Sequence, residues 1–229
     1  MRSSRWNAQG NVYLVTEETP LLPGTVIAAV GDADGILEVL AAGDDWIDIT
    51  IWNPDGSRAE MSGNGTRIAA RWLSESTAAR EVTVRVGPRA VRARMLDGDL
   101  VEQDLGAVSV GAPEEAAGVR FTPVDVGNPH AVVEGDPAEL PRIGPALETH
   151  SRFPNRTNVQ VARRLGGGEV EARVWERGVG ETGSSGTSAV AVAAALGVSP
   201  ATIRFPGGEL EVRIEGGRAF LTGPASRED

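Results

Sequence analysis

The chain contains neither cysteine nor lysine, and each absence removes a class of chemistry. Without cysteine there is no thiolate nucleophile, no disulfide and no zinc site built on sulfur. Because all 22 basic residues are arginines, a lysine Schiff base to pyridoxal phosphate or to a carbonyl substrate is excluded. With His130 and His150 as the only histidines, a histidine-rich metal site is excluded too. Carboxylates and hydroxyls remain as bases or ligands.

Long apolar runs and basic clusters are also missing. No stretch of 18 apolar residues occurs, and the first residues lead into no apolar leader, so we expect a cytoplasmic protein with no membrane partner. The net charge of −10 disfavours nucleic acid as a partner. With 41% hydrophobic residues, the composition is typical of a folded globular protein.

The chain is organised as two similar halves. In each, strand-like alternation is followed by a serine, glycines and an apolar helical segment. Trp52 stands ten residues before Ser62, and Trp175 stands ten residues before Ser185, which indicates an internal pseudo-repeat. The expected strands are 12–15, 35–40, 46–52, 82–86 and 171–175, and the expected helices are 66–73 and 189–196.

A break in the strand pattern at 111–118 divides the halves into 1–113 and 114–229. Short strands with one principal helix per half predict an α+β protein of two pseudo-symmetric domains. Each domain is expected to be a small β-barrel or sandwich around a central helix.

Ser62 and Ser185 have two interpretations. A serine before a helix is commonly an N-cap. A helix N-terminus is also an anion site, because its backbone N–H groups are unpaired and its dipole end is positive. Glycines such as Gly63 and Gly186 let an anion approach the backbone closely. An α-amino acid carboxylate would suit such a site.

Polar residues surround both serines. Asn53 and Asn64 flank the first. A glycine-rich loop with Arg177 between Glu176 and Glu181 precedes the second; it could fix a zwitterion or form an ordinary surface ion pair. His130, in a Gly-Asn-Pro-His turn, could satisfy a local hydrogen bond or act as a base.

Several motifs together resemble the diaminopimelate epimerase family along nearly the whole chain. The resemblance is carried, in order, by Gly10-Asn11, Asn53-Pro54-Asp55-Gly56-Ser57, Met61-Ser62-Gly63-Asn64-Gly65-Thr66-Arg67, Val126-Gly127-Asn128-Pro129-His130, Arg152-Phe153-Pro154-Asn155-Arg156-Thr157-Asn158-Val159, Trp175-Glu176-Arg177-Gly178-Val179-Gly180-Glu181-Thr182, Ser185-Gly186-Thr187 and Leu221-Thr222-Gly223-Pro224-Ala225.

The resemblance implies interconversion of LL- and meso-diaminopimelate in lysine and cell-wall precursor synthesis, without a cofactor. It implies a small amino-acid substrate as the partner and allows a homodimer, although the tail after Pro224 is short for the family. By motif, the ends of the substrate would be bound by Asn11, Asn53, Asn128, Asn158, Glu176 and Arg177. Its α-carboxylate would be held by Gly63, Asn64, Gly186 and Thr187, and His130 and Glu176 would tune the acid–base pair.

The chain departs from the family at the reacting groups. The family uses two cysteines, whereas here these positions are Ser62 and Ser185. A thiol has a pKa of about 8.5, and a serine hydroxyl is a far weaker acid. Three hypotheses follow: an epimerase whose serines are assisted by His130, Glu176 or water; a related isomerase or dehydratase of the proline racemase-like group; or an amino-acid-binding homologue without turnover.

Overall fold

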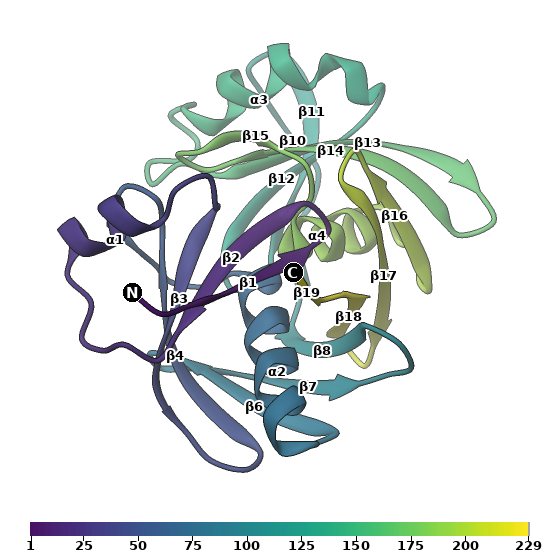
Figure 1. Ribbon diagram of the computed structural model, residues 1–229. Coiled ribbons are helices and arrows are strands. Elements are labelled where there is room, and N and C mark those ends of the chain that lie inside the picture. Colours follow the sequence, from purple (N-terminus) through teal and green to yellow (C-terminus); the bar gives the residue numbers. More distant parts are fainter. Residues whose placement is uncertain (229) are drawn as a thin grey trace. The chain divides into compact units, whose positions relative to one another are not determined.

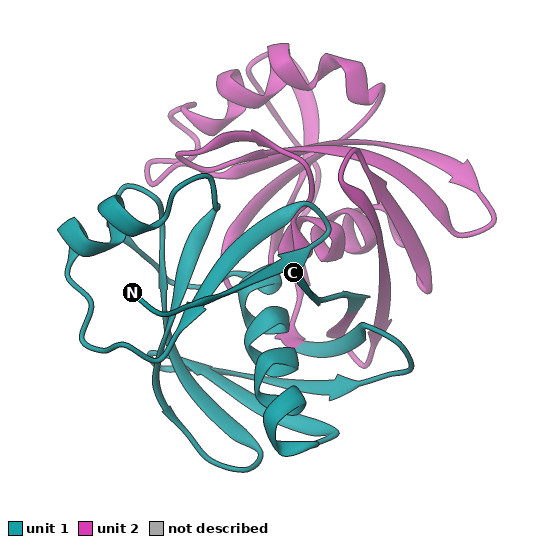
Figure 2. Ribbon diagram, viewed as in Figure 1, with its two compact units in different colours: residues 1–104, 222–229 teal, residues 105–221 magenta. Residues whose placement is uncertain are grey.

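The computed structural model describes residues 1–228, which form two compact units (Figures 1 and 2). Unit 1 comprises residues 1–104 and the C-terminal segment from residue 222, and unit 2 comprises residues 105–221. The expected division at 113/114 differs from these bounds in two places. Leu105 and Val108 already pack on the core of unit 2. The last strand, β19 (Ser226–Glu228), pairs with the first, β1 (Ser4–Ala8), and thereby belongs to unit 1.

Unit 1 is a run of short strands joined by two helical crossovers. The hydrogen-bonded neighbours are, in order, β19, β1, β2, β3, β4, β6, β7 and β8, with β5 as a short hairpin partner of β4. The pairs β2–β3 and β4–β6 are parallel, because α1 and α2 carry the chain back between them. The bounds are β2 (Asn11–Thr16), α1 (Pro23–Ala29), β3 (Gly35–Ala42), β4 (Trp46–Trp52), β5 (Arg58–Ala59), α2 (Gly63–Thr77), β6 (Glu81–Val86), β7 (Arg89–Met95) and β8 (Leu100–Ala107).

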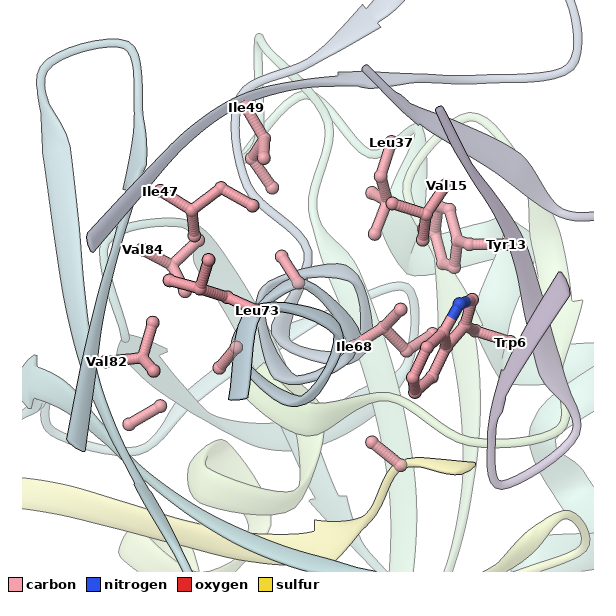
Figure 3. Packing of buried hydrophobic residues seen from close by; sticks show 14 of the residues in the cluster. Trp6, Tyr13, Val15, Leu37, Ile47, Ile49, Ile68, Leu73, Val82 and Val84 are labelled. Carbon is pink, nitrogen blue, oxygen red and sulfur yellow. The ribbon is translucent and has the colours of Figure 1, made fainter. Parts of the chain in front are cut away.

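The core of unit 1 forms around α2. In Figure 3 the strands surround this helix, and Ile68 and Leu73 extend from it towards Trp6, Ile47 and Val84. All five side chains are almost fully buried, as expected for a helix whose apolar face meets the inward-facing residues of alternating strands. A smaller cluster packs Val26 of α1 among residues that include Trp52.

Unit 2 repeats this plan and adds the short strand β10 and the turn η1. Its parallel pairs are β12–β13, joined through α3, and β14–β16, joined through α4. The bounds are β9 (Ser109–Val110), β10 (Glu114–Ala116), β11 (Val119–Asp125), β12 (Pro129–Glu134), the 3₁₀ turn η1 (Pro137–Glu139), α3 (Leu140–Glu148), β13 (Asn158–Gly166), β14 (Glu169–Glu176), β15 (Gly180–Thr182), α4 (Gly186–Leu196), β16 (Ala201–Phe205), β17 (Gly208–Glu215) and β18 (Arg218–Pro224).

The central helix of unit 2 is α4, whose alanine and valine side chains are buried among strand residues. Small side chains allow strands to pack closely on several sides of this helix. It ends at Gly197, which has a φ of 61° and so occupies the left-handed region that glycine tolerates without strain. The predicted helices and strands thus lie within the observed ones, and each unit has one central helix.

Within residues 1–228, none of the helices has the length and apolar character that crossing a lipid bilayer requires.

Candidate active site

Ser62 precedes α2 and serves as its N-cap. Its backbone is extended (φ −141°, ψ 121°), and its Oγ accepts a hydrogen bond from the Gly65 amide at 3.0 Å. The Tyr13 hydroxyl donates to the same Oγ at 3.2 Å. The capping interpretation therefore holds for Ser62, and its hydroxyl is polarised by two donors. The sequence pattern did not predict this contact of Tyr13, because an aromatic residue in an alternating strand is ordinarily part of the core.

Asn64 and Asn11 are joined in unit 1. Asn64 Nδ2 donates to Asn11 Oδ1 at 3.3 Å, and Asn64 Oδ1 accepts from Arg67 Nη2 at 2.9 Å. Both ends of the Asn64 amide are therefore engaged within the protein. Asn64 lies in the first turn of α2, so its backbone N–H is one of the unpaired helix-terminal donors that can bind an anion.

Gln103 fixes the first turn of α2 from the neighbouring strand β8. With its amide oriented to satisfy both ends, Nε2 donates to the Gly63 carbonyl at 3.0 Å. Its Oε1 accepts from the Thr66 hydroxyl at 2.8 Å and from the Arg67 amide at 3.0 Å. Gln103 is fully buried, so these bonds form in a low-dielectric environment and hold the helix terminus rigidly.

Asn53 closes the turn between β4 and β5. Its backbone N–H donates to the Ser57 carbonyl at 2.8 Å, and its Nδ2 donates to Ser57 Oγ at 2.9 Å. The structure therefore gives Asn53 a local turn function, and its assignment to substrate binding stays a prediction.

Ser185 occupies the matching place before α4 but differs from Ser62. Its backbone is also extended (φ −150°, ψ 126°), yet its side chain makes no capping hydrogen bond. Within residues 1–228 its hydroxyl has no hydrogen-bond partner, and the residue is 6% exposed. Ser185 is therefore the serine whose hydroxyl remains available to a ligand, beside the N-terminal residues Gly186 and Thr187.

A chain of hydrogen bonds runs through His130 to the first turn of α4. Gln160 Nε2 donates to Ser188 Oγ at 2.9 Å and contacts His130 Nδ1 at 3.0 Å. His130 Nε2 contacts Asn128 Oδ1 at 2.9 Å. Because a Gln160 N–H faces Nδ1, the network assigns the ring proton to Nε2. Asn128 Nδ2 then points to Thr187 Oγ1 at 3.4 Å.

This geometry changes the function expected for His130. The ring is 1% exposed, both nitrogens are engaged within the protein, and burial lowers its pKa to about 3. The Gln160 bond opposes this shift, and the charge of Arg177 adds to it. A neutral imidazole held in this way does not act as the proton acceptor; instead it fixes the amide of Asn128. The short-range pattern around His130 could not reveal this, because Gln160 is 30 residues away in the sequence.

Asn158 joins the loop that carries Arg177 to β12. It faces His130 in the parallel register of β12 and β13. Its Nδ2 donates to the Pro129 carbonyl at 3.0 Å, and its Oδ1 accepts from the Arg177 amide at 3.0 Å. The Arg177 side chain is exposed and has no acidic partner in the described part of the chain. An exposed guanidinium on an anchored loop can bind a carboxylate with two parallel hydrogen bonds.

Glu176 precedes Arg177 at the end of β14 and is half-buried. Its Oε1 accepts from the Thr182 hydroxyl at 2.6 Å across the β14–β15 hairpin. The hairpin therefore fixes one of the two carboxylate oxygens.

Each unit also contains a buried glutamate that the sequence pattern did not predict. Glu148 accepts from the Trp175 indole N–H and from the Gly178 amide, both at 2.8 Å. Glu38 accepts from the Trp52 indole at 2.8 Å. Burial alone would raise the pKa of Glu148, but the bonds from Trp175 and Gly178 and the charge of Arg156 outweigh it, so the pKa is lowered. The matched tryptophans thus each donate to a buried carboxylate, and in unit 2 that carboxylate also holds the loop at Gly178.

Unit 1 brings Asn11 and Asn64 together near the Ser62 cap, while unit 2 connects Asn128, His130 and Thr187 and anchors Arg177 on Asn158. No group of three or more acidic or histidine side chains among residues 1–228 is arranged to hold a metal ion.

Comparison with known proteins points to one family. The family model for diaminopimelate epimerase matches residues 122–228. A diaminopimelate epimerase of Desulforudis audaxviator is 33% identical over 98% of this chain and 96% of its own length. One from Thermobifida fusca is 43% identical over 76% of this chain and 68% of its own length.

Solved structures agree on the fold. A hydroxyproline epimerase of Agrobacterium vitis superposes with a TM-score of 0.69 at 17% identity, covering 99% of this chain and 88% of that one. A PhzF-family phenazine biosynthesis protein of Enterococcus faecalis gives a TM-score of 0.73 at 12% identity, covering 99% and 96%. These neighbours confirm the expected fold class. The relatives' names also confirm that the chain is of the isomerase class.

Proposed function

Because the chain belongs to the diaminopimelate epimerase family, we propose that it inverts the α-carbon of an amino acid without a cofactor, with LL- and meso-diaminopimelate as the substrate pair. One observation carries the proposal. Each unit presents a serine in extended backbone conformation directly before the N-terminus of its central helix, in the place where the family has a cysteine.

The helix termini supply the binding site for the α-carboxylate. The amides of Gly63 and Asn64 in α2, and of Gly186 and Thr187 in α4, lack intrahelical acceptors. Such donors stabilise a carboxylate and also the additional negative charge that develops when the α-proton leaves. The same backbone amides therefore bind the carboxylate and stabilise the charge that forms as the C–H bond breaks.

Proton transfer is assigned to the two serines. One hydroxyl oxygen, acting with a base, takes the α-proton as the C–H bond breaks, and the other delivers a proton to the opposite face of the carbanion. Ser62 is polarised by Tyr13 and Gly65, and Ser185 has a free hydroxyl in the described part of the chain. Since His130 is neutral and engaged, Glu176 or a bound water is the proposed assisting base.

The distal end of the substrate is assigned to unit 2. Arg177 would bind the distal carboxylate, because its guanidinium is exposed while Asn158 anchors its backbone. Asn128, oriented by His130, and Asn158 would complete this end. The three methylene carbons between the two α-carbons would then be read by the separation of these groups from the N-terminus of α4.

A second candidate function is binding of the same amino acid without turnover. It is favoured by the presence of hydroxyls at both reacting positions and by the absence, within residues 1–228, of a side chain hydrogen-bonded to the Ser185 hydroxyl. A hydroxyl without a base is a poor proton acceptor at neutral pH.

Proton NMR in deuterated water distinguishes the two functions. Purified protein is mixed with LL- or meso-diaminopimelate, and loss of the α-proton signal and appearance of the other isomer are followed. Interconversion that stops in Ser62→Ala and in Ser185→Ala, but continues in the matched control Ser76→Ala at the exposed end of α2, supports the epimerase. Saturable binding without exchange supports the binding protein. Exchange of proline but not diaminopimelate would assign the chain a different amino-acid substrate.

A further inference from the structure

Arg67 is a buried cation without a counterion. Its side chain lies in α2, one and a half turns after Ser62, and the residue is 0% exposed. Nε donates to the Pro224 carbonyl and Nη2 to Asn64 Oδ1, both at 2.9 Å. Nη1 has no hydrogen-bond partner within residues 1–228, and neither Nε nor Nη2 meets a carboxylate.

Burial lowers the pKa of Arg67 to about 10, which leaves it protonated at neutral pH. A buried ion that lacks a partner is strongly unfavourable, and proteins usually place a carboxylate beside it. An anionic ligand bound at the adjacent helix terminus would supply the negative charge that Arg67 lacks.

Arg67 also decides which atoms the neighbouring amides present. Guanidinium groups only donate, so the atom of Asn64 that faces Arg67 must be Oδ1. Asn64 Nδ2 then faces Asn11, whose Oδ1 accepts at 3.3 Å. Asn11 is left with its Nδ2 as the outward group, and this atom has no partner in the described residues. Because the Arg67 guanidinium can only donate, it fixes the orientation of the Asn64 amide and, through Asn64, that of the Asn11 amide.

Asp34 is a carboxylate beside this segment. Its Oδ2 accepts from the Val12 amide at 2.7 Å, and the residue is exposed. Within the described residues this carboxylate is not hydrogen-bonded to the side-chain amide of Asn11 or Asn64, and so the orientation of both amides depends on Arg67.

We propose that Arg67 is a specificity-determining positioning residue: by fixing the orientation of the Asn64 amide it leaves an N–H group of Asn11 available to a ligand, and it supplies positive charge, so that unit 1 accepts a carboxylate in preference to an ammonium group. The inference rests on the proposed function in taking Asn11 as a ligand-binding residue. It adds Arg67, which fixes the orientation of these amides while its own hydrogen-bonded atoms, Nε and Nη2, contact only the protein.

Two simple ligands separate the charges of diaminopimelate. Heptanedioate has the two carboxylates without ammonium groups, and 1,5-diaminopentane has the two ammonium groups without carboxylates. The full chain is titrated with each ligand, and the side-chain amide signals of Asn11 and Asn64 are followed by ¹⁵N NMR. The variant Arg67→Met removes the charge and the donors, and Arg71→Met makes the same change one turn later on α2, at an arginine that is partly exposed.

Heptanedioate should shift the Asn11 amide signals of the unaltered protein and bind at least about tenfold more weakly to Arg67→Met, as expected for loss of charge-assisted hydrogen bonding. Arg71→Met should bind it within twofold of the unaltered protein. Equal heptanedioate affinity in Arg67→Met and Arg71→Met overturns the inference. So does an unaltered protein in which heptanedioate leaves the Asn11 signals unchanged.

A second variant keeps the test decisive if Arg67→Met does not fold. Asn11→Asp keeps an acceptor for Asn64 but replaces the outward N–H with a carboxylate oxygen. It should reverse the preference, so that 1,5-diaminopentane binds more tightly than heptanedioate, whereas Asn155→Asp, an added charge on exposed chain in unit 2, should not. An unchanged preference in Asn11→Asp overturns the inference. Failure of the proposed function is a separate result, namely no α-proton exchange from diaminopimelate.

Discussion

The two serines differ in their hydrogen bonds, and this predicts a large difference in their contribution to stability. Ser62→Ala removes the acceptor of the Gly65 amide and of the Tyr13 hydroxyl. Loss of an N-cap costs about 0.5–2 kcal/mol, and loss of the second bond costs about 1 kcal/mol. The free energy of unfolding should therefore fall by roughly 1.5–3 kcal/mol. Ser185→Ala loses no capping bond, so its change should lie within about 0.5 kcal/mol.

Denaturant unfolding of both variants measures the difference. Four of the five tryptophans (Trp6, Trp46, Trp52 and Trp72) lie in unit 1, so fluorescence reports mainly on the unit that contains Ser62, while circular dichroism reports on both. The thermal unfolding midpoint of Ser62→Ala should also fall by roughly 3–12 °C, given about 2–4 °C per kcal/mol for a chain of this size.

Both variants should nevertheless stop interconversion of diaminopimelate. The result that refutes the reasoning is a Ser185→Ala variant that loses as much stability as Ser62→Ala, because the hydroxyl of Ser185 would then be bonded in solution. The control Ser76→Ala should retain both stability and exchange.

Three further outcomes are expected. The double substitution Ser62→Cys, Ser185→Cys should raise α-proton exchange at least about 100-fold, because a helix N-terminus lowers a thiol pKa from about 8.5 towards neutrality; an unchanged NMR rate would contradict this. Because burial lowers the His130 pKa to about 3, its stabilisation is present above the unfolded value of 6.5 and is lost as pH falls from 6.5 towards 3. In urea titrations the free energy of unfolding should fall by about 1.4 kcal/mol per pH unit in this range because of His130, and its dependence on pH should be weaker in His130→Asn. Glu148→Ala frees the loop that carries Arg177 and should weaken diaminopimelate binding several-fold by calorimetry, with kcat changed less than KM; equal affinity would remove Glu148 from the site.

Much of the local structure follows from the sequence alone. Alternation predicted strand 46–52, which is β4, because a strand exposes successive side chains to opposite faces. The serine–glycine turns predicted that a central helix follows each serine, because capping depends on residues within four positions; each helix begins three residues earlier than expected, at Gly63 and Gly186. The ten-residue spacing from Trp52 to Ser62 and from Trp175 to Ser185 revealed the repeat, which the matched parallel pairs β4–β6 and β14–β16 display.

Which polar groups are engaged depends on contacts between distant parts of the chain. His130 was a candidate base by sequence, but Gln160, 30 residues away, occupies its Nδ1, and Arg67 is buried against the Pro224 carbonyl, 157 residues away. The last strand likewise joined unit 1 by pairing with the first. The helices and strands, their repetition and the serine before each central helix could be predicted from the sequence, because these features depend on neighbours along the chain. Burial, proton placement and charge compensation were decided by the fold, because they depend on neighbours in space.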